Sequence, residues 1–198
     1  MISWIFIGLV MAILLTPGPT NTLLASSGIR IGLLQSLKLI PAEAIGYILA
    51  ISIWGFFVDW IAQSFPLLPM LMKLLSASYI IYLAMKLWKT AQHNIELNSP
   101  LIQPKELFAA TLLNPKALLF ACAVFPANTW LHWSNYLSNM ALFLILVLPI
   151  ALFWIAFGQL LAKSQVQWLT PFHLQRTASV VLMSFSLPMS YAAVVRLW

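Results

Sequence analysis

Long apolar runs, separated by short polar or turn segments, follow one another along almost the whole chain. The runs are apolar on all sides and show no strict alternation of apolar and polar residues, which favours helices over the strands of a membrane barrel. Each run reaches the roughly 20 residues that a helix needs to cross a bilayer. The predicted spans are 2–26, 36–60, 66–88, 107–128, 136–161 and 176–197. The pattern therefore predicts an all-α polytopic membrane protein with six transmembrane helices.

The polar stretch Thr90–Glu106 is the one long interruption of this pattern. It divides a single transmembrane domain into a first repeat at about 1–89 and a second repeat at about 107–198. Each repeat holds three predicted helices, and an odd number inserts the two repeats in opposite senses. We therefore expect two inverted three-helix repeats. No Lys or Arg precedes the first run, so we interpret it as a membrane helix rather than a signal peptide.

The composition excludes a water-soluble globule. Hydrophobic residues make up 62% of the chain, charged residues only 7%, and the mean hydropathy is +0.94, whereas soluble domains are about one quarter charged. The net charge of +6 would suggest nucleic acid in a soluble protein, but here the basic residues sit in short connections, so we expect no nucleic-acid partner. The single cysteine, Cys122, supports neither an intramolecular disulfide nor a thiolate metal site.

Basic residues predict the orientation. The first, third and fifth connections between the predicted helices carry Arg30, Lys38, Lys86, Lys89, Lys105, Lys163 and Arg176, whereas the second and fourth carry none. The positive-inside rule then places Thr90–Glu106 in the cytoplasm and both termini outside. The tryptophans fall near the ends of the predicted helices. We interpret them as anchors at the bilayer interface rather than as an aromatic ligand-binding site.

Two proline motifs lie inside apolar runs. Thr16–Asn21 interrupts the first predicted helix, and Asn114–Lys116 interrupts the fourth. Because proline has no backbone N–H, the carbonyls of Ile13, Leu15 and Thr111 are expected to lose their helical partners. Irregular backbone is tolerated at membrane depth only where it is buried in protein or lines a cavity. Both breaks are therefore candidate binding sites.

The two breaks occupy matching places in the two repeats, because Pro17 and Pro115 stand 98 positions apart in a chain of 198 residues. Secondary transporters built from inverted repeats bind their substrates at such broken helices, near the bilayer midplane. We therefore expect the two breaks to approach one another and to share a site. The candidate residues for substrate binding or gating in the breaks are Pro17, Gly18, Pro19, Asn21, Asn114, Pro115 and Lys116.

Ionisable residues inside the predicted helices are costly and point to function. Lys116 lies about 14 Å from the end of its helix and Glu43 about 10 Å from the end of the second helix, at 1.5 Å per residue. We expect Glu43 to face the interior and to neutralise Lys116; a proton-carrying or substrate-binding role for Glu43 remains equally open. Asp59 and Lys73 flank the second connection, which favours a structural ion pair near the outer face.

Three segments carry a resemblance to a known family: LLTPGPTNTLLASSGIRIGLLQSLK, LMKLLSASYIIYLAMKLWK and LLNPKALLFACAVFPANTW. In order and spacing they resemble the lysine-exporter (LysE-type) translocators, which are bacterial inner-membrane exporters of amino acids and related metabolites. The resemblance implies a recurring lysine at Lys73. Where the family commonly has an acid in the second helix, this chain has Tyr47, and Glu43 stands one turn earlier on the same face.

The predicted function is export of a small amino-acid-like solute by alternating access, driven by a gradient of protons or another ion. The chain has no Walker-type motif for binding ATP. Lys116 would meet the carboxylate of the solute, and Glu43 or freed carbonyls would meet its ammonium group. The lipid bilayer is the expected surrounding, and homo-oligomerisation stays open.

The sequence also bears on two other classes of function, an enzyme and a membrane scaffold. An enzyme is not expected, because the chain has no HExxH or GxSxG motif and no Cys and His pair, and its three histidines show no metal-ligand spacing. Neither a cofactor nor a metal is predicted. A non-transporting membrane scaffold that has kept the transporter fold is the alternative, since Tyr47, Ser76 and Ala84 depart from the family pattern. A hydratable cavity at the breaks would favour transport, and a solidly packed interior would favour a scaffold.

Overall fold

The structure is a computed structural model that describes residues 4–62 and 101–163, together with single positions between 64 and 89 and positions 176 and 180. All elements in the continuous ranges are helical: α1 (Trp4–Leu15), α2 (Pro19–Ser36), α3 (Leu39–Ala62), α5 (Pro104–Leu112), α6 (Pro115–Leu119), a π-helical turn η1 (Phe120–Val124), a 3-10 turn η2 (Ala127–Thr129) and α7 (Trp133–Lys163). The all-α prediction is confirmed. The predicted helices at 66–88 and 176–197 lie largely outside the described residues.

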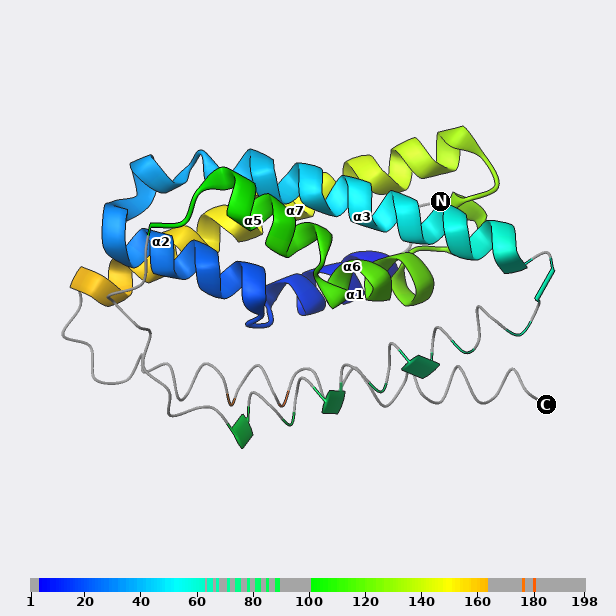
Figure 1. Ribbon diagram of the computed structural model, residues 1–198, viewed down its shortest axis with the longest axis horizontal. Coiled ribbons are helices and arrows are strands. Elements are labelled where there is room, and N and C mark those ends of the chain that lie inside the picture. Colours follow the sequence, from blue (N-terminus) through cyan, green and yellow to red (C-terminus); the bar gives the residue numbers. More distant parts are fainter. Residues whose placement is uncertain are drawn as a thin grey trace.

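Two of the described helices, α3 and α7, are each long and apolar enough to cross a membrane. Two helix pairs pass the same test when each is taken as one bent span: α1 with α2, bent by 56°, and α5 with the segment Pro115–Val124, bent by 44°. Figure 1 shows that these two broken spans run in opposite directions, with their breaks near the middle of the molecule. The inverted repeats expected from the sequence stay a prediction, because the third and sixth helices lie largely outside the described residues.

The first predicted helix differs most from the structure. It was expected to end near residue 26, but helical backbone continues to a kink at Gly32, beyond which a last turn of α2 reaches Ser36. The small polar residues beside the expected end are buried, and the hydroxyls of Ser27 and Ser36 lie 2.8 Å apart. Inside α2, Gly32 has a φ of 77°, and the backbone N–H of Leu33 beyond it donates to Gln159 Oε1 of α7 at 2.8 Å. Contact with α7 therefore stabilises a helix that its own sequence does not favour.

The other boundaries differ less. Helix α5 begins at Pro104, within the predicted polar loop, because Glu106 Oε2 accepts from the backbone N–H of Gln103 at 2.9 Å and caps the helix. The fourth span ends in the π-helical turn at Val124 rather than at 128, and α7 extends slightly beyond the predicted 136–161 at both ends. Pro149 lies inside α7, where it does not end the helix.

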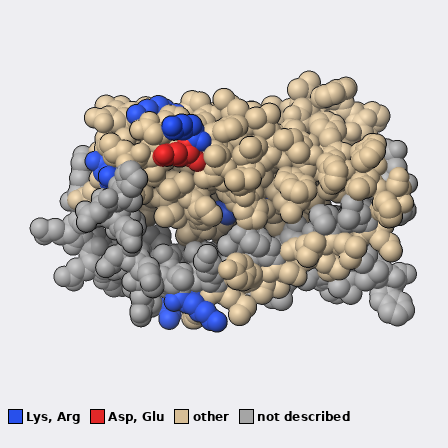
Figure 2. Space-filling view, in the orientation of Figure 1, with Lys and Arg blue, Asp and Glu red and all other residues tan. Residues whose placement is uncertain are grey.

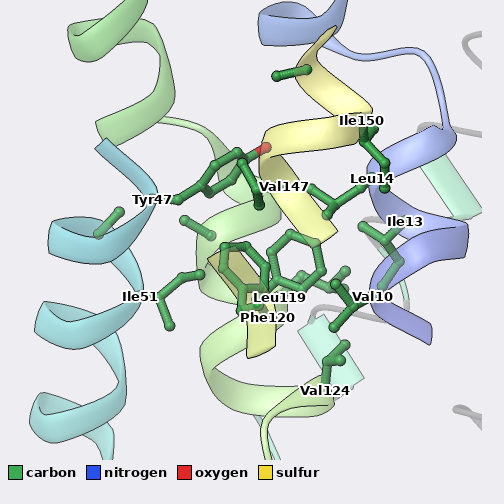
Figure 3. Packing of buried hydrophobic residues seen from close by; sticks show 14 of the residues in the cluster. Val10, Ile13, Leu14, Tyr47, Ile51, Leu119, Phe120, Val124, Val147 and Ile150 are labelled. Carbon is green, nitrogen blue, oxygen red and sulfur yellow. The ribbon is translucent and has the colours of Figure 1, made fainter. Parts of the chain in front are cut away.

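The core forms where α1, α3, α7 and the α6–η1 segment meet. Figure 3 shows their side chains converging around the ring of Phe120, which packs edge to face against Tyr47 and Phe143 with centroids 6.0 and 5.0 Å apart. Helix α3 packs on α5 at Gly46, where an added Cβ would lie 2.7 Å from the Thr111 side chain. This close helix contact aligns the second break with α3.

Charge is distributed unevenly along the bundle. Most of the Lys and Arg visible in Figure 2 lie at the end where α2 ends and α5 begins. At the opposite end, the described residues 44–62 and 117–140 contain one charged residue, Asp59, and no Lys or Arg. Trp133 is 71% exposed there and Trp130 packs over Gly55, in a cluster with Phe56 and Tyr136. The positive-inside rule relies on such an uneven distribution of Lys and Arg and places the basic end in the cytoplasm. The orientation therefore stays as predicted from the sequence.

Single-cysteine labelling tests this orientation. In a Cys122→Ser background, we expect a membrane-impermeant maleimide to label Ser134→Cys in intact cells and Lys105→Cys only after permeabilisation, because the basic end faces the cytoplasm. Both positions are exposed and lie at opposite ends of the described bundle. The cysteine-free variant is the control. Labelling of Lys105→Cys but not Ser134→Cys in intact cells would invert the topology.

Candidate functional site

The first break leaves three backbone carbonyls without their helical partners, and side chains take over their hydrogen bonds. Asn21 Nδ2 donates to the carbonyl oxygens of Leu14 at 2.6 Å and Thr16 at 2.7 Å. The Thr16 hydroxyl donates to the Ile13 carbonyl at 2.6 Å, and Trp154 Nε1 donates to Leu14 at 3.4 Å. The break predicted at Thr16–Asn21 is confirmed, and Asn21, a predicted site residue, holds its shape.

Lys116 reaches from the second break into the first. Its ammonium nitrogen Nζ donates to the carbonyl oxygens of Ile13 at 3.0 Å and Thr16 at 2.8 Å. We call these two oxygens the carbonyl cradle. Gly18 makes room for the ammonium, because a Cβ there would lie 2.9 Å from both Cε and Nζ of Lys116. The two breaks therefore lie against one another, as the sequence predicted.

The second break is built around Asn114. Its side-chain oxygen Oδ1 accepts from the backbone N–H of Lys116 at 3.0 Å and so caps α6, whose first residue is Pro115. Its amide Nδ2 donates to the hydroxyls of Thr20 and Tyr47, both at 3.4 Å. The Thr111 carbonyl, expected to be free, accepts instead from the backbone N–H of Asn114 at 3.0 Å. Asn114 thus joins the second break to α2 and α3.

Helix α3 contributes Glu43 and Tyr47, one turn apart on the face turned to the breaks. Glu43 is 2% exposed and Tyr47 1%, and the Tyr47 hydroxyl accepts from Asn114 Nδ2, as does the hydroxyl of Thr20. The expectation that Glu43 faces the interior is therefore confirmed. Tyr47, which stands where the family commonly has an acid, takes part in the same hydrogen-bond network.

The predicted pairing of Glu43 with Lys116 needs correction. The two charges attract one another through the interior, but no ion pair of 4.0 Å or less joins these two described residues. The physical reason is that the broken helix offers the ammonium two carbonyl oxygens directly beside the lysine. Glu43 balances the charge of Lys116 from a distance.

The site is closed to solvent in this conformation. Each polar side chain of the two breaks and of the facing α3 surface is at most 3% exposed: Thr16, Thr20, Asn21, Glu43, Tyr47, Asn114 and Lys116. In contrast, Pro17, Gly18 and Pro115 are partly exposed and Pro19 is exposed, so these residues shape the backbone rather than line the interior. Lys73 lies outside the described residues, as does its expected pairing with Asp59.

Sequence reasoning missed three residues of the site. Thr16 and Thr20 flank the prolines and looked like ordinary turn residues, and Trp154 looked like part of an apolar helix. The sequence did contain a signal for the two threonines. Short hydroxyl side chains commonly form hydrogen bonds with freed carbonyls and buried acids close to them. Trp154 gave no such signal, since only the fold brings α7 beside the first break. The described residues contain no group of three potential metal ligands.

The comparison with known protein families agrees with this architecture. A family model described as LysE type translocator matches residues 11–193, which include both breaks. No curated protein and no solved structure matches the chain. The match covers nearly the whole chain and includes all the helices described here except the start of α1. The chain therefore belongs to the LysE type translocator family and is a multi-pass membrane protein of a transporter family.

Proposed function

We propose that this protein is a secondary transporter of the bacterial inner membrane that exports amino acids or related zwitterionic metabolites. The observation that carries the proposal is the contact of the two helix breaks, in which Lys116 of one break binds the carbonyl cradle of the other. Breaks that meet inside a bundle provide polar groups without exposing them to lipid. This is the arrangement that binds small polar solutes at mid-depth in transporters with inverted repeats.

The chemistry of the site suits a zwitterion. A solute that enters the bundle loses its hydration. The free-energy cost of this loss is offset only where charged or polar groups replace the water. Lys116 provides a cation for a carboxylate, and the carbonyls of Ile13 and Thr16 provide acceptors for an ammonium group. The amide of Asn114 and the hydroxyl of Thr20 lie beside them as neutral partners. The site therefore matches both ends of an amino acid.

Glu43 is the residue we propose for coupling to a proton gradient. Among the described residues it is the one carboxylate buried beside the breaks, and it attracts Lys116 without contacting it. A proton on Glu43 would change the balance of charge around Lys116 and hence the affinity of the site for a charged solute. Alternating access would expose the site to the two sides in turn, and the present conformation is closed to solvent.

Efflux from vesicles tests the proposal. We expect proteoliposomes loaded with labelled amino acids to lose at least one of them faster than protein-free vesicles, because the protein supplies the polar groups that a bilayer lacks. If protons drive export, a protonophore slows gradient-driven efflux about tenfold or more, equivalent to a rise of about 1.4 kcal/mol or more in the activation free energy. Lys105→Gln, on the exposed start of α5, is the control that keeps wild-type rates. Efflux equal to that of protein-free vesicles for every amino acid would refute the proposal.

The close packing of the breaks also favours the second candidate, a membrane scaffold that has kept the transporter fold. The side chains of the site are buried and bonded to one another, and a scaffold needs no conformational change to open them. The same efflux measurement separates the two functions, since a scaffold gives no solute-specific efflux with or without a gradient.

A further inference from the structure

The carbonyl cradle already holds a primary ammonium group, and that group belongs to the chain itself. Nζ of Lys116 is the same chemical group as the α-ammonium of an amino acid, and its carbonyl partners lie at 3.0 and 2.8 Å. Both distances are typical of charge-assisted hydrogen bonds. Lysine therefore occupies the place that the ammonium end of a zwitterionic solute would need.

We propose that the carbonyl cradle is the subsite for the primary ammonium group of the solute, and that Lys116 is its resident occupant, displaced when the solute binds. In the exchange, the solute ammonium takes the oxygens of Ile13 and Thr16, and Lys116 turns to the solute carboxylate. The inference rests on the proposed function and extends it, because it names the group that the cradle selects and the residue that must leave.

The cradle keeps its shape when Lys116 leaves. The Thr16 carbonyl still accepts from Asn21 Nδ2 at 2.7 Å, and the Ile13 carbonyl still accepts from the Thr16 hydroxyl at 2.6 Å. The Thr16 oxygen then has a second lone pair for an incoming donor. The Ile13 oxygen also accepts from the backbone N–H of Thr16 at 3.3 Å, and it can take a further ammonium donor as it takes that of Lys116. Lys116 comes from the opposite break on a flexible four-carbon stem, and Gly18 leaves the space around its ammonium free of a side chain. Once the site is open, the exchange thus needs no refolding of the break.

The charges explain why an isolated amine would not displace Lys116 in the wild-type protein. Methylammonium in the cradle would leave two cations in the closed interior with Glu43 as the nearby acid, and a buried unpaired charge is strongly unfavourable. A zwitterion brings its own carboxylate, so each cation keeps a partner. Because the cradle accepts hydrogen bonds from N–H groups, it selects primary ammonium groups over quaternary ones.

Thermal unfolding of purified protein with methylammonium chloride tests the cradle directly. In Lys116→Met the cradle is empty, so we expect methylammonium to raise the melting temperature by about 3 °C or more, as a ligand of the native state does. Tetramethylammonium chloride at the same ionic strength has no N–H to donate and gives no comparable rise. In the wild type and in Lys105→Met, which removes an exposed lysine, both salts act alike. Equal effects of the two salts on Lys116→Met would overturn the proposal.

A second measurement covers the case in which Lys116→Met folds poorly. Recovery of folded protein from methylammonium buffer and not from tetramethylammonium buffer supports the proposal, and recovery from neither contradicts it. The test requires no gradient and no transport. Failure of efflux with methylammonium binding intact therefore refutes the proposed function, whereas export by the wild type combined with no methylammonium effect on Lys116→Met refutes the exchange alone.

Discussion

Exchange of Lys116 for glutamine is expected to reduce amino-acid efflux at least about 100-fold, which corresponds to the loss of about 2.7 kcal/mol of binding to the solute carboxylate. The same change should lower the free energy of unfolding by about 2 kcal/mol, since hydrogen bonds from a charged donor to the carbonyls of Ile13 and Thr16 are lost. Efflux from proteoliposomes and denaturant unfolding in detergent measure the two effects. An efflux rate within twofold of the wild type would exclude Lys116 from the site.

A double-mutant cycle with Glu43→Gln shows how the two charges are coupled. Because Lys116 binds carbonyl oxygens rather than the carboxylate, we expect Glu43→Gln to destabilise the protein less than Lys116→Gln does. The coupling energy should stay below about 1 kcal/mol, as for charges that are not in contact. A coupling energy of about 3 kcal/mol or more would instead indicate a direct buried ion pair between Glu43 and Lys116 in the purified protein.

The positions of the two breaks were predictable because proline acts locally. Pro17 and Pro115 each remove a backbone donor within an apolar run, and the helix breaks at both places. Pro149 shows the limit of that reasoning, since it lies inside α7 and the helix continues through it. The difference lies in the neighbours: Gly18 and Pro19 follow Pro17, and Asn114 caps the helix that begins at Pro115. A lone proline in an apolar stretch has no such support.

The course of α2 was not predictable from its own residues. The apolar run predicted an end near residue 26, yet Gly28 and Gly158 allow the backbones of α2 and α7 to approach closely. An added Cβ at Gly28 would lie 2.0 Å from the Ile155 carbonyl oxygen, and one at Gly158 would lie 1.9 Å from that of Ala25. Small residues favour such contacts between membrane helices. The partner helix begins about a hundred positions later, so local patterns contain no information about it.

The members of the site were largely predictable, whereas their pairing was not. Intramembrane Lys116 and Glu43 stand out because charges there are costly, and opposite charges at similar depth suggested a direct pair. The sequence does not show that the broken helix presents carbonyl oxygens closer to Lys116 than the carboxylate of Glu43. It also does not show that Asn114 bridges Thr20 and Tyr47. Backbone acceptors exist at every residue, so only the geometry of the break reveals which ones are used.

Asn21 is the residue that the geometry makes indispensable for the first break. Its amide donates to two carbonyl oxygens, at 2.6 and 2.7 Å, and the side chain is 3% exposed. Asn21→Leu keeps the volume but removes both amide donors, so the Leu14 carbonyl keeps only its 3.4 Å bond from Trp154 and the Thr16 carbonyl keeps only its bond from Lys116. Loss of a buried hydrogen bond costs about 1–3 kcal/mol. We therefore expect a loss of about 2–4 kcal/mol in unfolding free energy and, because the cradle loses its shape, loss of efflux.

Asn135→Leu is the matched control. It removes one solvent-exposed hydrogen bond, in which the side-chain amide of Asn135 donates to the Asn128 carbonyl at 3.1 Å near the start of α7. Water can replace that bond, so the expected cost is below about 1 kcal/mol. Asn21→Asp separates shape from charge: a carboxylate cannot donate to the carbonyls of Leu14 and Thr16 and draws Lys116 away from the cradle. Both Asn21 variants should therefore fail in efflux, whereas an Asn21→Leu protein as stable and active as Asn135→Leu would show that the first break is held by other contacts.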